Sequence, residues 1–155
     1  MISPELLRRY PFFSFLDAAQ QKAIAMIAEE VSCESGATIF EEGRPAEALY
    51  LLLEGGVDLS FTPRSENGAP LHEKILVGEI NPGEPFGISA LIEPHLLTAT
   101  AHASRTCRLL KIEGAALRAL CEVDCRLGYA LMRQVAKAAL ERLHFTRIQL
   151  AAVRA

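Results

Sequence analysis

Short segments in which apolar and polar residues alternate fill the middle of the chain, and glycine turns separate them. Alternation with a period of two is typical of β-strands. We predict strands over residues 31–33, 38–41, 49–53, 57–61, 74–77, 97–103 and 107–112. Turn signals lie between them at Ser35-Gly36, Glu42-Gly43, Gly55-Gly56 and Asn67-Gly68. Many short strands at this spacing favour a mainly β fold, either a barrel or a jelly roll.

Helical patterns flank the strand-rich region on both sides. Near the N-terminus, Asp17 and Gln20 form a capping box that predicts a helix over residues 18–29. After the last strand, a short helix is predicted over residues 114–121 and a long one from Cys125 to about residue 150. The sequence thus favours a mainly β jelly roll with flanking α-helices.

Composition limits the domain count and the kind of partner. With 155 residues, half of them hydrophobic and 23% charged, the chain suits one globular domain. We assign residues 1–29 to a helical lead-in, 30–112 to a β-roll and 114–153 to C-terminal helices. The net charge of −3 does not indicate a nucleic-acid partner, and no apolar run is long enough to span a membrane. Without a signal-peptide pattern, the sequence predicts a cytoplasmic protein.

Residues 81–100 read as a turn, a short apolar helix, a loop and a strand. Asn81-Pro82-Gly83 is turn punctuation, and Gly87 permits a close backbone approach before the helix over residues 88–92. The first N–H groups of such a helix suit an anion such as a phosphate. Glu93-Pro94 is expected to end the helix.

This stretch resembles the phosphate-binding cassette of the cyclic nucleotide-binding domain family, of the catabolite activator protein type. The match runs through Ile80-Asn81-Pro82-Gly83-Glu84-Pro85-Phe86-Gly87 and Ala90-Leu91-Ile92. Glycines of the first two hairpins, in the runs 36–43 and 54–57, add to it. The resemblance implies a double-stranded β-helix, or jelly roll, in a regulatory and non-enzymatic domain. Relatives that regulate transcription continue into a helix-turn-helix domain, which we do not expect here because the chain stops at Ala155.

Two charged positions of the family pattern are replaced. The family glutamate that binds the ribose 2′-hydroxyl falls on Ile88, and the family arginine that pairs with the cyclic phosphate falls on Leu97. A buried phosphate without a countercharge is unfavourable. The resemblance therefore implies the family scaffold without its usual ligand contacts.

The candidate ligand site is this degenerate cassette. It comprises Phe86, Gly87, Ile88, Ser89, Ala90, Leu97, Thr98 and Ala99. The hydroxyls of Ser89, Thr98 and Thr100 are candidate hydrogen-bonding groups. Three alternatives stay open: a cyclic nucleotide bound through altered contacts, a less polar small molecule, or a pocket closed by Ile88 and Leu97 in a scaffold or interaction module. No cofactor is predicted beyond cyclic AMP or cyclic GMP as such a ligand.

Other site types have weaker support. His95 and His102 lie near the cassette without standard metal-ligand spacing, and the clustered histidines of metal-dependent cupins are absent. No spacing suggests a Ser-His-Asp or Cys-His set, so we predict neither a metal site nor an enzyme.

The long C-terminal helix has two apolar stripes. Leu127, Leu131, Val135 and Ala138 form one, which is expected to pack on the roll. The other repeats close to every seven residues and includes Tyr129, Met132, Ala136, Ala139, Leu143 and Leu150. We predict that this second stripe forms the interface of a homodimer, the position of the dimer helix in the family.

Overall fold

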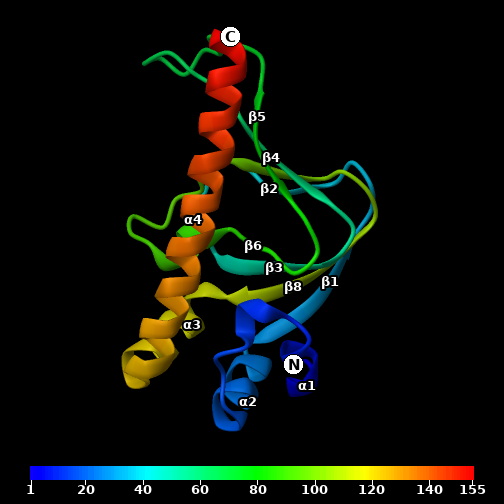
Figure 1. The fold of residues 1–155 in the computed structure, drawn as a ribbon, viewed down its shortest axis with the longest axis vertical. Coiled ribbons are helices and arrows are strands. Elements are labelled where there is room, and N and C mark those ends of the chain that lie inside the picture. Colours follow the sequence, from blue (N-terminus) through cyan, green and yellow to red (C-terminus); the bar gives the residue numbers. More distant parts are fainter.

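The computed structural model describes residues 1–155 and contains two four-stranded antiparallel sheets with helices at both chain ends (Figure 1). The first sheet has the order β1 (Ala28–Cys33), β8 (Cys107–Glu113), β3 (Ala48–Glu54) and β6 (Pro85–Phe86). The second has the order β2 (Thr38–Phe40), β7 (Thr100–Ala103), β4 (Val57–Phe61) and β5 (Ile75–Ile80). The predicted mainly β jelly roll with flanking helices is confirmed.

Side chains from both sheets meet inside the roll. Leu52, Phe86 and Leu109 of the first sheet pack in one cluster with Leu59 and Ala101 of the second. All five are at most 4% exposed. Burying such apolar surface is the main favourable term in folding, so this cluster holds the two sheets together.

The outer face of the first sheet is covered by helices. The N-terminal elements are α1 (Pro4–Arg8), the 3₁₀ turn η1 (Pro11–Phe13) and α2 (Ala18–Met26), and the C-terminal ones are α3 (Gly114–Val123) and α4 (Cys125–Arg154). Leu51 and Leu53 point to this helical layer, whereas Leu52 points into the roll. The apolar run of residues 51–53 is therefore covered on both faces of the sheet.

The capping box at the start of α2 is present, but the helix is shorter than predicted. The Gln20 amide donates to Asp17 Oδ1 at 2.8 Å, and the Asp17 amide donates to Gln20 Oε1 at 3.0 Å. The predicted end at residue 29 is wrong, because β1 already begins at Ala28, which pairs with Ile112 of β8. Sheet pairing overrides the helical preference of these last residues.

Three strand predictions also need correction. The two-residue β6 was not predicted, and β7 begins at Thr100 rather than Leu97. Leu97 lies instead in a loop, where its amide donates to the Arg44 carbonyl at 2.9 Å. In β4 a register shift after Leu59 leaves Phe61 41% exposed, although strict alternation with Val57 and Leu59 would place it inside the roll.

Helix α4 runs along one side of the roll, and its C-terminal end lies level with the loop between β4 and β5 (Figure 1). Asp124 caps it by accepting a bond from the Leu127 amide at 3.1 Å. The predicted inner stripe is buried, as Leu127, Leu131, Val135 and Ala138 are at most 8% exposed. Neither α4 nor any other helix has both the length and the hydropathy needed to span a lipid bilayer.

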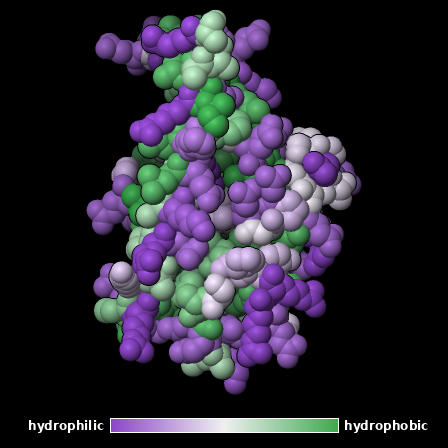
Figure 2. Space-filling model, in the orientation of Figure 1, coloured by the Kyte–Doolittle hydropathy of each residue, from purple (hydrophilic) through white to green (hydrophobic).

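The opposite side of α4 exposes apolar side chains. Tyr129, Leu140, Leu143 and Leu150 are between 45% and 65% exposed. Figure 2 shows hydrophobic side chains among hydrophilic ones toward the C-terminal end of this helix. Met132, which the sequence places in the same stripe, is only partly exposed because it also contacts the core below α4.

Candidate functional site

The segment that joins β6 to β7 enters a short 3₁₀ helix through Gly87. This helix, η2 (Ile88–Leu91), starts from a left-handed backbone at Gly87, with φ of 71°. A Cβ atom at this position would lie 3.0 Å from the Ala48 carbonyl oxygen and 3.1 Å from the Tyr50 ring. Only glycine satisfies both the dihedral angle and the close approach. Gly87 therefore fixes how the cassette sits against β3.

We expect Gly87→Ala to lower the free energy of unfolding by about 1–2 kcal/mol, the cost of a left-handed residue with a Cβ, plus the cost of the contact with Ala48. Urea unfolding measures the change. The matched control is Gly36→Ala, because Gly36 also has a positive φ of 88° but open space around the added Cβ. A loss no greater than that of the control would show that the close approach is unimportant.

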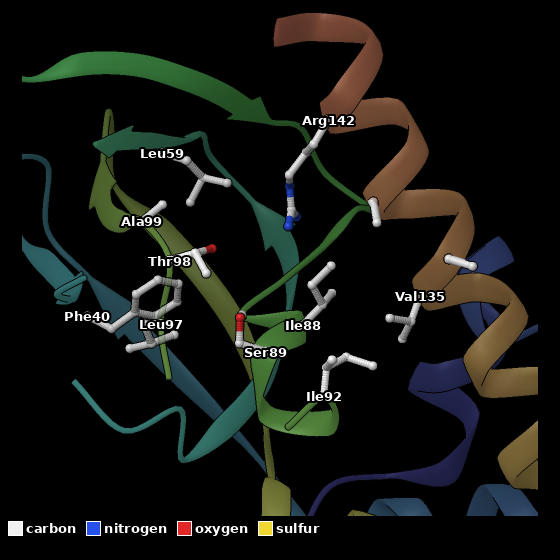
Figure 3. Close-up of a pocket in the computed structure, with 13 residues that line it drawn as sticks. Phe40, Leu59, Ile88, Ser89, Ile92, Leu97, Thr98, Ala99, Val135 and Arg142 are labelled. Carbon is white, nitrogen blue, oxygen red and sulfur yellow. The ribbon is translucent and has the colours of Figure 1, made fainter. Parts of the chain in front are cut away.

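A cavity of about 500 Å³ lies between η2, the second sheet and α4 (Figure 3). The cassette and the following loop supply Gly87, Ile88, Ser89 and Ile92, then Leu97, Thr98 and Ala99. Phe40 and Leu59 come from the sheet, and Val135, Ala136, Ala139 and Arg142 come from α4. Its volume lies within the range of small-molecule sites.

Most of the residues predicted for the ligand site line this cavity, but Phe86 and Ala90 do not. Phe86 is fully buried in the roll and stacks on Tyr50 with ring centroids 5.1 Å apart. Ala90 is fully buried beneath Leu97. Thr100 is also outside the cavity lining, and its hydroxyl accepts a bond from the Glu42 amide at 3.0 Å.

The cavity wall is largely apolar. Nine of its thirteen lining residues are hydrophobic, and none is acidic. Leu97, at the position of the family arginine, is 7% exposed and packs on Ala46 and Ala90. Ile88 lines the wall at the position of the family glutamate. The side-chain hydroxyls available to a ligand are those of Ser89 and Thr98.

The only charged residue of the cavity, Arg142, was not among the predicted site residues. It reaches in from α4 (Figure 3), and its Nη2 donates to the Pro85 carbonyl at 2.6 Å. Burial lowers the pKa of the Arg142 guanidinium, and the more distant carboxylates of Glu84 and Glu141 oppose this shift. A signal was present in the sequence, because Arg142 follows Ala138 by four residues and so continues the buried stripe of α4.

The basic residues nearest to the cassette in sequence, and the two histidines considered above, lie outside the cavity lining. Arg44 lines a separate hollow beside Glu41 and Glu47, and Arg105 lines neither this hollow nor the cavity. His102 is hydrogen-bonded to Thr38 Oγ1 at 3.2 Å, and His95 lies in the loop after η2. No group of three or more His, Cys, Asp or Glu side chains is placed to hold a metal ion.

The chain is similar to proteins of one family along most of its length. Residues 30–124 match the model of the cyclic nucleotide-binding domain. A crystal structure of a candidate cyclic nucleotide-binding protein from Geobacter metallireducens is 45% identical, with a TM-score of 0.79, over 93% of this chain and all of that one. The N-terminal domain of a Streptomyces coelicolor transcriptional regulator is 32% identical, with a TM-score of 0.66, over 88% of this chain and 93% of that domain.

Two curated relatives are longer proteins. A candidate potassium channel protein of Rhodopseudomonas palustris is 31% identical over 77% of this chain. A CRP-like cAMP-activated global transcriptional regulator of Mycobacterium tuberculosis is 25% identical over 86% of this chain. The matches span 27% and 57% of these two relatives. The jelly roll, the cassette and the family match over more than half of the residues agree, and the chain belongs to the cyclic nucleotide-binding domain family.

Proposed function

We propose that this domain is a non-enzymatic regulatory module that senses a small molecule in the cavity and does not bind cyclic AMP or cyclic GMP through the usual contacts of the family. One observation carries the proposal: the cassette forms part of the wall of a cavity of about 500 Å³, yet Ile88 and Leu97 occupy the two anchor positions. A cytoplasmic location, expected from the sequence, belongs to the same proposal.

A cyclic nucleotide would lose favourable contacts in this cavity. Its ribose 2′-hydroxyl would meet Ile88, which accepts no hydrogen bond, and its phosphate would meet Leu97. Desolvating a phosphate without an ion pair at that point is costly. Arg142 is a cation, but it enters the cavity from α4, on the wall opposite the cassette, and not at either of the two anchor positions. It therefore does not restore the contacts that the cassette lacks.

The cavity also favours a sensor over a scaffold with a closed pocket. If Ile88 and Leu97 filled the pocket as extra core, little space would remain between η2 and α4. Instead both side chains form part of the wall of the cavity. An apolar wall with a few polar groups is the usual composition of a small-molecule site.

Occupancy of the cavity can be tested with a neutral apolar fluorophore, N-phenyl-1-naphthylamine. We expect its fluorescence to rise on binding to the wild type. We expect Ala139→Phe to weaken binding about tenfold, because a phenyl ring here would occupy part of the cavity and keep the fluorophore from apolar wall surface worth about 25 cal/mol per Å². Ala151→Phe is the control, since Ala151 is exposed on the same helix outside the cavity lining. Equal binding by both variants would refute cavity occupancy.

A further inference from the structure

Arg142 places a guanidinium group in a cavity whose other side chains are apolar or carry only a hydroxyl (Figure 3). Its only hydrogen bond is the one from Nη2 to the Pro85 carbonyl at 2.6 Å. It forms no ion pair, because the carboxylates within 4.0 Å of an arginine are those of Glu30 and Glu54, both beside Arg108. Most of the five N–H donors of Arg142 therefore have no protein partner.

These unused donors are not sealed inside the protein. No side-chain nitrogen or oxygen atom of the chain is both fully buried and without a hydrogen-bond partner. The free nitrogens of Arg142 therefore meet accessible space, and Figure 3 shows the guanidinium directed toward Ile88 and Thr98. The bond to the Pro85 carbonyl uses one N–H donor of the guanidinium, and the remaining N–H donors are available to a ligand.

We propose that the cavity binds a small organic acid, whose carboxylate pairs with Arg142 and whose apolar body lies against Ile88, Leu97 and Val135. This inference rests on the proposed sensing function and specifies the chemical class of the effector. It adds an anchor on α4, whereas the sequence placed every candidate ligand residue in the cassette.

The charge and shape of the site select this class. The lining of the cavity holds a single cation and no acid, which matches a monoanion, and the planar guanidinium fork matches the two oxygens of a carboxylate. Ser89 and Thr98 are the only residues in the wall with a hydroxyl side chain. A ligand with many polar groups would therefore have most of its own polar groups unpaired in the cavity. An apolar body avoids that cost.

The test uses two acids and their neutral amides as probes: octanoate with octanamide, and 4-phenylbutyrate with 4-phenylbutyramide. Displacement of N-phenyl-1-naphthylamine or calorimetry gives each Kd. For the wild type we expect at least one acid to bind about tenfold or more tightly than its amide, because a charge-assisted pair is stronger than a neutral hydrogen bond. Arg142→Gln should abolish this difference, and Arg142→Lys should keep part of it.

Arg147→Gln is the matched control. Arg147 is exposed on the same helix, so this variant loses the same charge outside the cavity and should bind as the wild type does. Circular dichroism and urea unfolding establish that the Arg142 variants are folded. If Arg142→Gln unfolds, the Arg142→Lys variant and the acid-to-amide ratio of the wild type still decide the question.

The inference is overturned if acids bind no better than amides, if Arg142→Gln leaves their ratio unchanged, or if neither acid binds at millimolar concentration. These failures are distinct from failure of the sensing function. Fluorophore binding that is lost in Ala139→Phe would retain a small-molecule cavity with a neutral ligand. Absence of both fluorophore and acid binding would remove the sensing function as well.

Discussion

The double variant Ile88→Glu, Leu97→Arg is expected to bind cyclic AMP or cyclic GMP at micromolar concentration, whereas we expect no binding by the wild type at tens of micromolar. The introduced glutamate would accept a hydrogen bond from the ribose 2′-hydroxyl, and the introduced arginine would pair with the phosphate. Hydrogen bonds to charged groups contribute about 1.5–3 kcal/mol each, so two of them strengthen binding about a hundredfold or more. Isothermal titration calorimetry of both proteins measures the change.

The single variants separate the two contacts. Leu97→Arg alone should restore part of the affinity, and Ile88→Glu alone should restore less, because a second anion in the cavity repels the phosphate. Leu97 is 7% exposed, so urea unfolding must show that the arginine variants remain folded. Micromolar binding by the wild type would contradict the premise that these anchors are needed. A folded double variant without any gain would contradict the matching of Ile88 and Leu97 to the family positions.

The second large effect concerns self-association. We propose that the outer stripe of α4 forms a two-fold dimer, and we expect Leu143→Glu to convert a dimer into folded monomers. Leu143 is 45% exposed in the single chain and is flanked along the stripe by Ala136 and Leu150. An apolar stripe on a two-fold axis is self-complementary, and a glutamate there would be desolvated beside its own symmetry mate.

Light scattering at high micromolar concentration measures the mass of each protein. The control is Ile148→Glu, because Ile148 is 57% exposed but lies five residues farther on, about 140° around the helix from Leu143. This variant should remain a dimer. A monomeric wild type would contradict the proposal. If both variants dissociate equally, the added charge disrupts the dimer wherever it stands on the helix, and the stripe is not the specific interface.

The sequence predicted the framework of this fold because local patterns decide it. Alternation with a period of two marks β4 and β8, and the capping box at Asp17 marks the start of α2. The buried stripe of α4 was also readable, since residues three and four apart share one face of a helix. Local patterns did not predict the elements that depend on pairing with distant strands. Examples are the start of β1 at Ala28 and the two-residue β6.

The sequence predicted only the wall of the cavity that the cassette forms. The cassette motif located Ile88 and Leu97, but it carries no information about which part of the chain closes the opposite wall. That wall comes from Val135 and Arg142, which are brought there by the packing of α4. A charged residue that continues an apolar stripe is the local clue to Arg142, and only the folded chain reveals what the guanidinium faces.

The position of α4 would couple the two proposed equilibria, effector binding and self-association. Ala136 and Ala139 line the cavity, and the same residues belong to the stripe proposed for self-association. An effector and a second copy of the chain would therefore both contact this part of the helix. Any cooperativity between them must be reciprocal: an effector that promotes association tenfold is itself bound tenfold more tightly by the dimer, a coupling free energy of about 1.4 kcal/mol.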